Sequence, residues 1–498
     1  MNTLCLDSLA LTSSQGRLGT LTLLGCLSLL VACGPDGQAV DASSGDAATR
    51  DAATRDAATR DAATRDAATR DAATGDAGSL PPADVVPTGL HEIHVATDGD
   101  DGAACSADAP CLTFARAAEV MVSGDELVVH PGRYPLAVHG SLRLFTSGGS
   151  PVPLSGAVPS GIDADQPTVI RALTPGSVDI EGGLTLGTRS AKVRYAFIYG
   201  LTFHGGGQIY NGDYNVVKAC GFEGGFAIGT IDHAQGNTFN LLEDVWLWGK
   251  NVRVLGINYR AHHNTWRRVL LRTDGCDEDY CGERAGNYAV ALSAYNSHDT
   301  TFENVLVLDR VLGANPYGYA DFATAQHDSS QPEQPEGERL GRNRWLGCMS
   351  IHSEDAALVF EADAVETGTT GTLIDFVALD TAAGVSIDPA HRPYTGNSVF
   401  RVERLWSYPR GDGSNAFHIG CDVVQAGDPG CAHDVTGVES GAYAGGLAAT
   451  TLPETRYGAA ESLWPWPHEE RIKAELCATE TRGLCGSTDS LSAYVHSF

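Results

Sequence analysis

The sequence of 498 residues has few basic residues, little methionine and almost no long apolar segment. Lys and Arg total 33 against 62 Asp and Glu, which gives a formal charge of -29. This deficit argues against a general nucleic-acid binder, because neutralising phosphates requires a surplus of Lys and Arg. Only 3 Met beside 58 Gly, without long helical heptads, argues against a helical bundle. The only long apolar run lies near the N-terminus, which excludes a membrane protein with several spans.

That apolar run extends from Leu18 to Ala32, follows Arg17 and ends in Leu-Val-Ala-Cys33. Its length, and the small residue before the cysteine, are typical of a secretory signal rather than of a membrane span. The ending resembles the bacterial lipobox, which implies that Cys33 is diacylated and becomes the mature N-terminus. We therefore expect a lipoprotein signal peptide over 1–32 and a membrane anchor in the bacterial cell envelope, at the outer membrane or cell surface. An ordinary signal peptide with an incidental cysteine is the alternative.

A perfect repeat follows the expected anchor. Asp46-Ala-Ala-Thr-Arg50 occurs five times in succession up to Arg70 and then decays. It contains no large apolar residue, so nothing in it can be buried to offset the entropy of ordering the chain. The sequence therefore predicts a disordered tether over 33–86 between the lipid and a folded domain.

Ten cysteines follow the anchor, and eight of them form close couples. In an exported chain such couples most simply close small loops as disulfides. Zinc is the alternative, but no couple has the two-residue gap of a zinc knuckle and no His pair completes one. The expected disulfides are Cys105/Cys111, Cys276/Cys281, Cys421/Cys431 and Cys477/Cys485.

The start of the expected domain combines several short motifs. An Asp/Gly-rich loop lies within His94–Gly102, Ala-Pro-Cys111 precedes a stretch that is apolar at helical spacing, and Ser123–Tyr134 reads turn, strand, turn. Together these motifs resemble the opening of right-handed parallel β-helix proteins of the pectin-lyase type. The resemblance implies an all-β solenoid with a short N-terminal capping helix. It does not indicate an activity, because many unrelated activities share that opening.

The body of the chain supports a coil independently. Apolar or small residues recur at offsets of zero, three and five, and the last two are spaced as inward residues of one strand. Variable spacing between these units suits one turn of coil plus loops of different length. The triplets are Ile198/Leu201/Phe203, Val217/Cys220/Phe222, Leu242/Val245/Leu247, Trp266/Val269/Leu271, Phe302/Val305/Val307, Trp345/Cys348/Ser350, Leu373/Phe376/Ala378 and Val402/Leu405/Ser407.

A second alternating strand follows in most units. We expect its inward pairs to be Phe226/Ile228, Val252/Val254, Ala289/Ala291, Ala357/Val359, Val385/Ile387 and Phe417/Ile419.

Two further features follow from the triplets. Cys220 and Cys348 take the middle position, so we expect buried, inert thiols. Two residues before the triplets stand Asn215, Asn240, Asn264 and Asn343, which can hydrogen-bond along the coil axis at a turn.

The C-terminal region changes character. Leu463-Trp-Pro-Trp-Pro-His468 precedes a helical run, Glu469 to Leu476, and the Cys477/Cys485 loop. We expect the β-helix over 87–450 and a helical, disulfide-closed cap over 451–498. The cap would plug the open end of the coil, since an uncovered end strand invites association. A carbohydrate platform made by Trp464 and Trp466 is the alternative.

Charged residues follow the last strand of the triplet units and would form a stripe along one edge. A solvated corner is the simpler interpretation, since the turns of any soluble coil are polar. The stripe comprises Glu223, Lys250, Arg272, Asp274, Asp309, Arg310, His352, Glu354, Asp355, Asp380, Arg410 and Asp412.

The resemblance implies a groove for extended polysaccharides, and two reactions would use such a stripe. In β-elimination from a uronate, calcium held by Asp274, Asp309 and Asp380 would neutralise the sugar carboxylate, and Lys250 or Arg272 would remove the neighbouring proton. In hydrolysis, Asp309 and Asp380 would flank the bond. The candidate catalytic residues are Lys250, Arg272, Asp309, His352 and Asp380.

Two other polar groups are less informative. His262 and His263 are adjacent, and adjacent residues on a strand point to opposite faces, so we expect turn polarity rather than a metal site. The acids of Asp277-Glu-Asp279 would be solvated. The sequence thus predicts a membrane-tethered monomer that contacts polysaccharide, with a polysaccharide lyase or glycoside hydrolase as the candidate activity and calcium as the candidate cofactor. A non-catalytic surface or adhesion protein with a rigid coil is the alternative.

Overall fold

The computed structural model describes residues 86–144, 157–188, 191–229, 237–283, 289–314, 318–326, 342–362, 370–387, 399–419, 434–445 and 452–498. The expected signal peptide, the lipidation residue Cys33 and all but the last residue of the expected tether lie outside this part. Among the helices that are described, none combines the length and the apolar character needed to cross a membrane.

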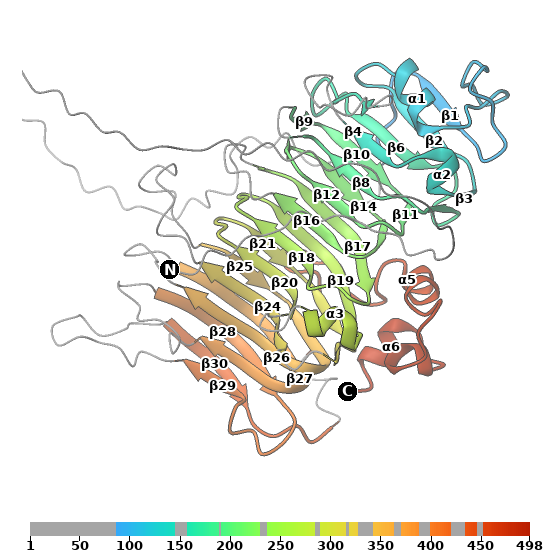
Figure 1. The fold of residues 1–498 in the computed structure, drawn as a ribbon. Helices are drawn as coiled ribbons and strands as arrows, with labels where there is room; N and C mark the ends of the chain where they lie inside the picture. Colours follow the sequence, from blue (N-terminus) through green and yellow to red (C-terminus); the bar gives the residue numbers. More distant parts are fainter. Residues whose placement is uncertain are drawn as a thin grey trace, which may run out of the picture. The chain divides into compact units, whose positions relative to one another are not determined.

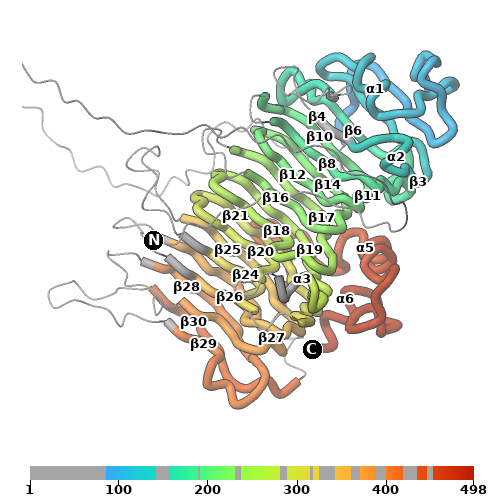
Figure 2. Tube along the Cα trace, in the orientation of Figure 1, coloured from blue at the N-terminus to red at the C-terminus, as the bar shows by residue number. Residues whose placement is uncertain are grey.

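The described residues form a parallel β-helix, as the sequence predicts (Figure 1). Every pairing between named strands is parallel, and the strands of successive turns stack on three sides of the coil. Figure 2 shows the chain advancing from the blue N-terminal coils to the orange last ones.

The first side of the coil is a stack of parallel strands. Five of them, β17, β19, β27, β28 and β30, are long enough to extend onto other sides as well. Its strands are β1 (Glu92–Val95), β2 (Glu126–Val129), β6 (Thr168–Ala172), β10 (Ala196–Tyr199), β14 (Val216–Lys218), β17 (Leu241–Gly249), β19 (Thr265–Cys276), β21 (Thr301–Glu303), β25 (Arg344–Leu346), β27 (Thr370–Ile387), β28 (Val399–Tyr408) and β30 (Asp434–Ser440).

The second side consists of the later parts of those long strands and of short strands between them. The other strands here are β3 (Gly132–Tyr134), β7 (Val178–Ile180), β11 (Thr202–Phe203), β15 (Gly221–Glu223), β22 (Leu306–Leu308) and the start of β26 (Met349–Ala362).

The third side includes the ends of β26 and β27. Its other strands are β4 (Leu142–Leu144), β5 (Ala157–Val158), β8 (Leu184–Leu186), β12 (Gly207–Ile209), β16 (Phe226–Gly229), β18 (Val254–Tyr259), β20 (Ala289–Tyr295), β24 (Gly318–Gln326) and β29 (Phe417–Ile419). Two small pairings lie at corners, β9 (Val193–Arg194) with β13 (Gly212–Asp213), and β23 (Val311–Gly313) with the end of β19.

The first coil is covered by the expected capping helix. Helix α1 (Phe114–Val120) begins where the Thr113 hydroxyl accepts a hydrogen bond from Arg116 N, a standard N-cap. It buries Phe114 and Ala117 against the core. The Cys105–Cys111 disulfide closes the preceding loop, and α2 (Leu136–His139) follows β3.

The predicted triplets stack in register on the first two sides. On the first side Ile198 pairs with Val217, which pairs with Leu242, and the row continues through Trp266 to Val402. These side chains are fully or almost fully buried. Cys220 and Cys348 are free thiols inside this core, which confirms their expected position.

The third side departs from its expected register. Phe226 pairs with Gly256, where Val252 was expected, and in the next coil Leu292 continues this row, where Ala289 was expected. Gly256 offers no side chain, and the Leu292 side chain fills the space that a Cβ there would occupy. A search for apolar residues cannot detect an inward glycine whose space is filled by neighbouring side chains. The predicted register was therefore wrong by a few residues in these coils. The register is as expected from Val385 to Phe417.

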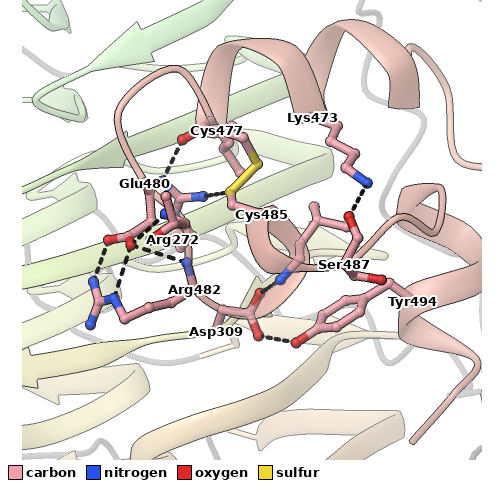
Figure 3. Close-up of a disulfide and its surroundings, with 12 residues drawn as sticks. Arg272, Asp309, Lys473, Cys477, Glu480, Arg482, Cys485, Ser487 and Tyr494 are labelled. Atoms are coloured by element: carbon pink, nitrogen blue, oxygen red, sulfur yellow. Dashed lines mark hydrogen bonds and ion pairs between the residues drawn. A yellow bond between two sulfur atoms is a disulfide. The ribbon is translucent and has the colours of Figure 1, made fainter.

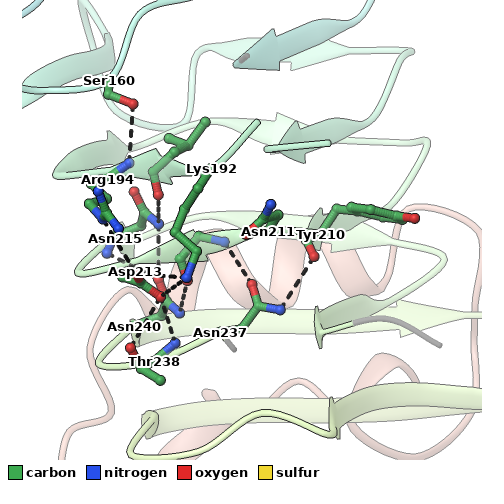
Figure 4. A network of polar contacts seen from close by, with 12 residues as sticks. Ser160, Lys192, Arg194, Tyr210, Asn211, Asp213, Asn215, Asn237, Thr238 and Asn240 are labelled. Carbon is green, nitrogen blue, oxygen red and sulfur yellow. Dashed lines mark hydrogen bonds and ion pairs between the residues drawn. The ribbon is translucent and has the colours of Figure 1, made fainter. Parts of the chain in front are cut away.

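The predicted asparagine ladder is present at the corner between the third and first sides (Figure 4). Asn215 Nδ2 donates to Asn240 Oδ1 at 2.9 Å, and Asn240 Nδ2 donates to Asn264 Oδ1 at 3.0 Å. Each amide also bonds backbone groups of neighbouring coils, so the ladder satisfies buried polar groups that no strand pairing reaches.

The C-terminal segment, residues 452–498, contains α5 (Glu469–Leu476), η1 (Gly483–Gly486) and α6 (Leu491–Val495), and the expected Cys477–Cys485 disulfide links the first two. It lies beside the coil in Figure 1. Its apolar side chains pack on outward residues of the second side, among them Trp246, Leu270 and Met349. The expectation that it plugs the open end is therefore wrong. Trp466 is buried in this interface, which removes the suggested carbohydrate platform.

Candidate functional site

Three of the predicted catalytic residues occupy equivalent positions in consecutive coils. Leu308 pairs with Ile351, which pairs with Leu379, and Asp309, His352 and Asp380 come directly after them. All three have left-handed backbone, with φ of 53°, 54° and 52°. This conformation turns the chain at the corner between the second and third sides, and successive coils lie about 4.8 Å apart, so the three side chains are neighbours.

Asp309 is buried and accepts three hydrogen bonds. Its Oδ1 accepts from His352 Nδ1 at 2.6 Å and from the Tyr494 hydroxyl at 2.8 Å, and its Oδ2 accepts from Leu484 N at 2.6 Å. Figure 3 shows the Tyr494 hydroxyl facing the Asp309 carboxylate. These three donors fix the position of the carboxylate, so Asp309 orients the imidazole of His352.

His352 connects this carboxylate with the next coil. The hydrogen bond to Asp309 places a proton on His352 Nδ1 and leaves a lone pair on Nε2 in the neutral ring. Nε2 lies 3.9 Å from Asp380 Oδ2. The side chain is 38% exposed. The hydrogen bond to Asp309 raises the pKa of His352 above its ordinary value, although burial opposes this effect. The site therefore offers a half-exposed imidazole that a buried carboxylate orients.

The coil also places the guanidinium of Arg410 at this site. Arg410, from the coil after Asp380, donates through Nε at 2.7 Å and through Nη2 at 3.2 Å to the two Asp380 oxygens. Arg410 is 39% exposed, so it can also meet a dissolved anion.

Aromatic residues of the C-terminal segment border the same site. The ring centroids of Phe498 and His352 are 5.3 Å apart, and Tyr494 packs edge-on against Phe498. Burial, and then the negative charge of Asp309, raise the pKa of the Tyr494 hydroxyl, which therefore stays protonated. These residues were missed from the sequence, because nothing local places the last residues of the chain beside His352.

Arg272 and Asp274 lie beneath the C-terminal segment instead. The Arg272 guanidinium binds both Asp274 oxygens, at 2.7 and 3.1 Å, and donates to Leu476 O at 2.6 Å. Only 2% of the Arg272 residue is exposed. Figure 3 shows it directed at the Cys477–Cys485 loop. It fastens the segment to the coil and cannot reach a substrate in this structure, so we do not retain it as a base.

Lys250 follows β17 and therefore comes from an earlier coil than Asp309, His352 and Asp380. It is an exposed residue and pairs with Asp277 at 2.5 Å. The expected calcium ligands are likewise engaged elsewhere, Asp274 by Arg272 and Asp380 by Arg410. Within the described residues, the carboxylates of Asp274, Asp309 and Asp380 do not form a cluster with the spacing of metal ligands. The structure thus gives the calcium prediction no support.

The remaining expected disulfides are only partly described. Cys276 is disulfide-bonded. The side chain of its expected partner Cys281, on α3 (Glu278–Glu283), lies outside the described part, as do Cys421 and Cys431.

Comparisons with known proteins are sparse. No known family model matches the sequence, and no curated protein matches it. Matching solved structures include a rhamnogalacturonan lyase, at 15% identity over 64% of this chain and 70% of that chain, with a TM-score of 0.25. A GH136 lacto-N-biosidase from Eubacterium ramulus matches at 11% identity over 70% and 65%, with a TM-score of 0.35. A PL6 family polysaccharide lyase from Pseudopedobacter saltans matches at 11% over 65% and 90%, with a TM-score of 0.27. At such scores these likenesses carry no argument about activity, which has to come from the site.

Proposed function

We propose that the protein is a lipid-anchored β-helix protein of the bacterial cell envelope that binds acidic polysaccharide beside His352 and cleaves it by β-elimination. The observation that carries this proposal is the pairing of buried Asp309 with His352. A carboxylate that holds one ring nitrogen fixes the imidazole tautomer and leaves the other nitrogen to transfer a proton.

The reaction needs one base and one cation. The lone pair of His352 Nε2 would take the proton from the carbon next to the sugar carboxylate. The released electron pair forms a carbon–carbon double bond as the bond to the neighbouring sugar's oxygen breaks, and His352 returns the proton to that oxygen. Arg410 would bind the sugar carboxylate in competition with Asp380, and this neutralisation makes the adjacent carbon more acidic.

Hydrolysis by Asp309 and Asp380 is less well supported. An acid catalyst must carry a proton, whereas Asp309 accepts three hydrogen bonds and Asp380 binds a guanidinium.

The location rests on the sequence. Cys33 at the end of an apolar run, followed by the low-complexity repeat, supports acylation and a long tether. Acyl chains contribute about 0.8 kcal/mol per buried methylene, so a multiply acylated cysteine would hold the chain on a membrane. The coil would then act near the cell surface.

A non-catalytic scaffold is the second candidate, and one observation favours it. Many corner charges are paired across coils, as in Arg342 with Asp299, Arg404 with Asp375 and Arg410 with Asp380. Such pairs stiffen a rod without requiring a ligand.

The test is ultraviolet absorbance of unsaturated uronate products over a panel of acidic polysaccharides, with calcium and with a chelator. We expect activity that rises with pH, because the base form of His352 must be neutral and its pKa is raised. His352→Gln should abolish product formation.

The matched control is His204→Gln. His204 is also half-exposed and bonded to a carboxylate, Glu223 Oε2 at 2.7 Å, but it lies on an earlier coil. Equal loss in both variants would refute the assigned site. Release of reducing ends without ultraviolet absorbance would indicate hydrolysis. If no glycan gave any product, the non-catalytic scaffold would be the supported function.

A further inference from the structure

Three histidines converge at the corner between the third and first sides, on a different edge of the coil from His352. Potential ligand nitrogens of His262, His263 and His298 all lie within 4.8 Å of one another. His262 Nδ1 and His263 Nδ1 are 2.8 Å apart, and His298 comes from the next coil, where it pairs with His262.

The backbone explains why adjacent residues can share a ligand. His262 and His263 lie not on a strand but at the turn before β19, and His263 has a left-handed φ of 56°. This conformation breaks the alternation of a strand, so the two imidazoles meet instead of pointing to opposite faces. The expectation from strand geometry was therefore wrong at this pair.

The tautomer of His298 suits a metal ligand. Its Nδ1 donates to Asp299 Oδ2 at 2.8 Å, which leaves the Nε2 lone pair for an ion. Arg342 in turn holds both Asp299 oxygens at 2.6 Å. A carboxylate behind a histidine is the usual outer support of a metal-bound imidazole.

The ligand set selects the ion. Three imidazoles suit borderline ions such as Zn²⁺ rather than calcium, which prefers oxygen. Zinc bound by three protein ligands keeps a fourth position for water. Nitrogens bound to one tetrahedral zinc are about 3.3 Å apart, given Zn–N bonds of about 2.0 Å, so the cluster needs only partial closure.

One rearrangement is required. The His262 and His298 rings are stacked, with centroids 4.5 Å apart and planes at 10°. Parallel rings one coil apart cannot both aim an in-plane lone pair at one ion, so at least one must turn. His263 is 41% exposed at its side chain and can follow such a movement.

We propose that His262, His263 and His298 form a Zn²⁺ site that joins two consecutive coils, with Asp299 as its outer support. The site is independent of the chemistry at His352. It would fasten neighbouring turns of the coil and would hold a water molecule at the exposed edge.

The experiment titrates the full chain in detergent, after alkylation of accessible thiols, with Zn²⁺ and with Co²⁺ as a coloured substitute. We expect one equivalent to bind, a tetrahedral Co²⁺ spectrum, and a higher thermal unfolding midpoint with Zn²⁺. Asp299→Asn should weaken binding by about 10- to 100-fold, and Asn tolerates the left-handed backbone at this position.

His263→Asn is the decisive variant, because the residue is exposed and Asn again suits the left-handed φ. It should remove the stoichiometric binding and the cobalt spectrum, as should His298→Gln if that buried variant folds. His204→Gln, which removes a histidine flanked by carboxylates elsewhere, should bind as wild type does. Absence of stoichiometric binding, or binding that survives His263→Asn, would overturn the proposal.

Discussion

The asparagine ladder allows a graded test of how polar groups stabilise the coil. Asn240 and Asn343 hold equivalent turn positions, and each residue is 2% exposed. The Asn240 side chain takes part in four hydrogen bonds, two with Asn215, one with Asn264 and one with Gly212 O. The Asn343 side chain takes part in two, with Thr300 N and Ser297 O.

The magnitudes follow from this difference. A typical hydrogen bond contributes about 1 kcal/mol to the free energy of unfolding. Asn240→Ala should therefore cost about 4 kcal/mol and Asn343→Ala about 2 kcal/mol. Both substitutions remove the same atoms from equally buried sites, so the cavity contribution is matched and the difference of about 2 kcal/mol reports the hydrogen bonds.

Urea unfolding followed by tryptophan fluorescence measures both variants, provided that the slope with denaturant is unchanged. Hydrogen exchange of the amides in β17 and β19 would show whether the loss is local to those coils, as expected for a repeat structure. If Asn343→Ala cost as much as Asn240→Ala or more, counting ladder hydrogen bonds would be the wrong explanation of stability at this corner.

Further predictions concern single residues. The raised pKa of His352 implies stability that is complete below pH 6.5 and declines as pH rises through the folded pKa; urea midpoints of wild type should show this slope and those of His352→Gln should not. Cys348→Asp should cost at least about 3 kcal/mol, since it buries an unpaired polar group, and native Cys348 should resist alkylation because burial raises its pKa to about 12. Arg272→Met should cost about 3 kcal/mol by leaving Asp274 without its partner, and proteolysis of 452–498 should become faster. Cys33→Ser should move the protein from membrane fractions to the soluble extract.

The sequence predicted the fold well where inward positions carry large side chains. The rows through Trp266 and Val269 repeat because each coil must fill the same interior. The third side was misaligned because Gly256 and the buried, hydrogen-bonded Asn258 carry no apolar signal there.

The position of the C-terminal segment could have been inferred from one feature. Val245-Trp246-Leu247-Trp248 is apolar at every position, and a strand that is apolar on both faces is buried on both faces. The run therefore indicates a covering layer on the second side. It does not identify that layer, and for this reason Tyr494 and Phe498 could not be placed beside His352 from the sequence.

The C-terminal segment also changes the topology of what would otherwise be a chain of local contacts. Thr202 bonds Glu475 across 273 positions, and Asp309 bonds Leu484 across 175. In a simple repeat protein each turn depends only on its neighbours, and folding can spread from any point. Here the C-terminal segment bridges coils from β11 to β27. The middle of the rod should therefore unfold as one cooperative unit rather than coil by coil.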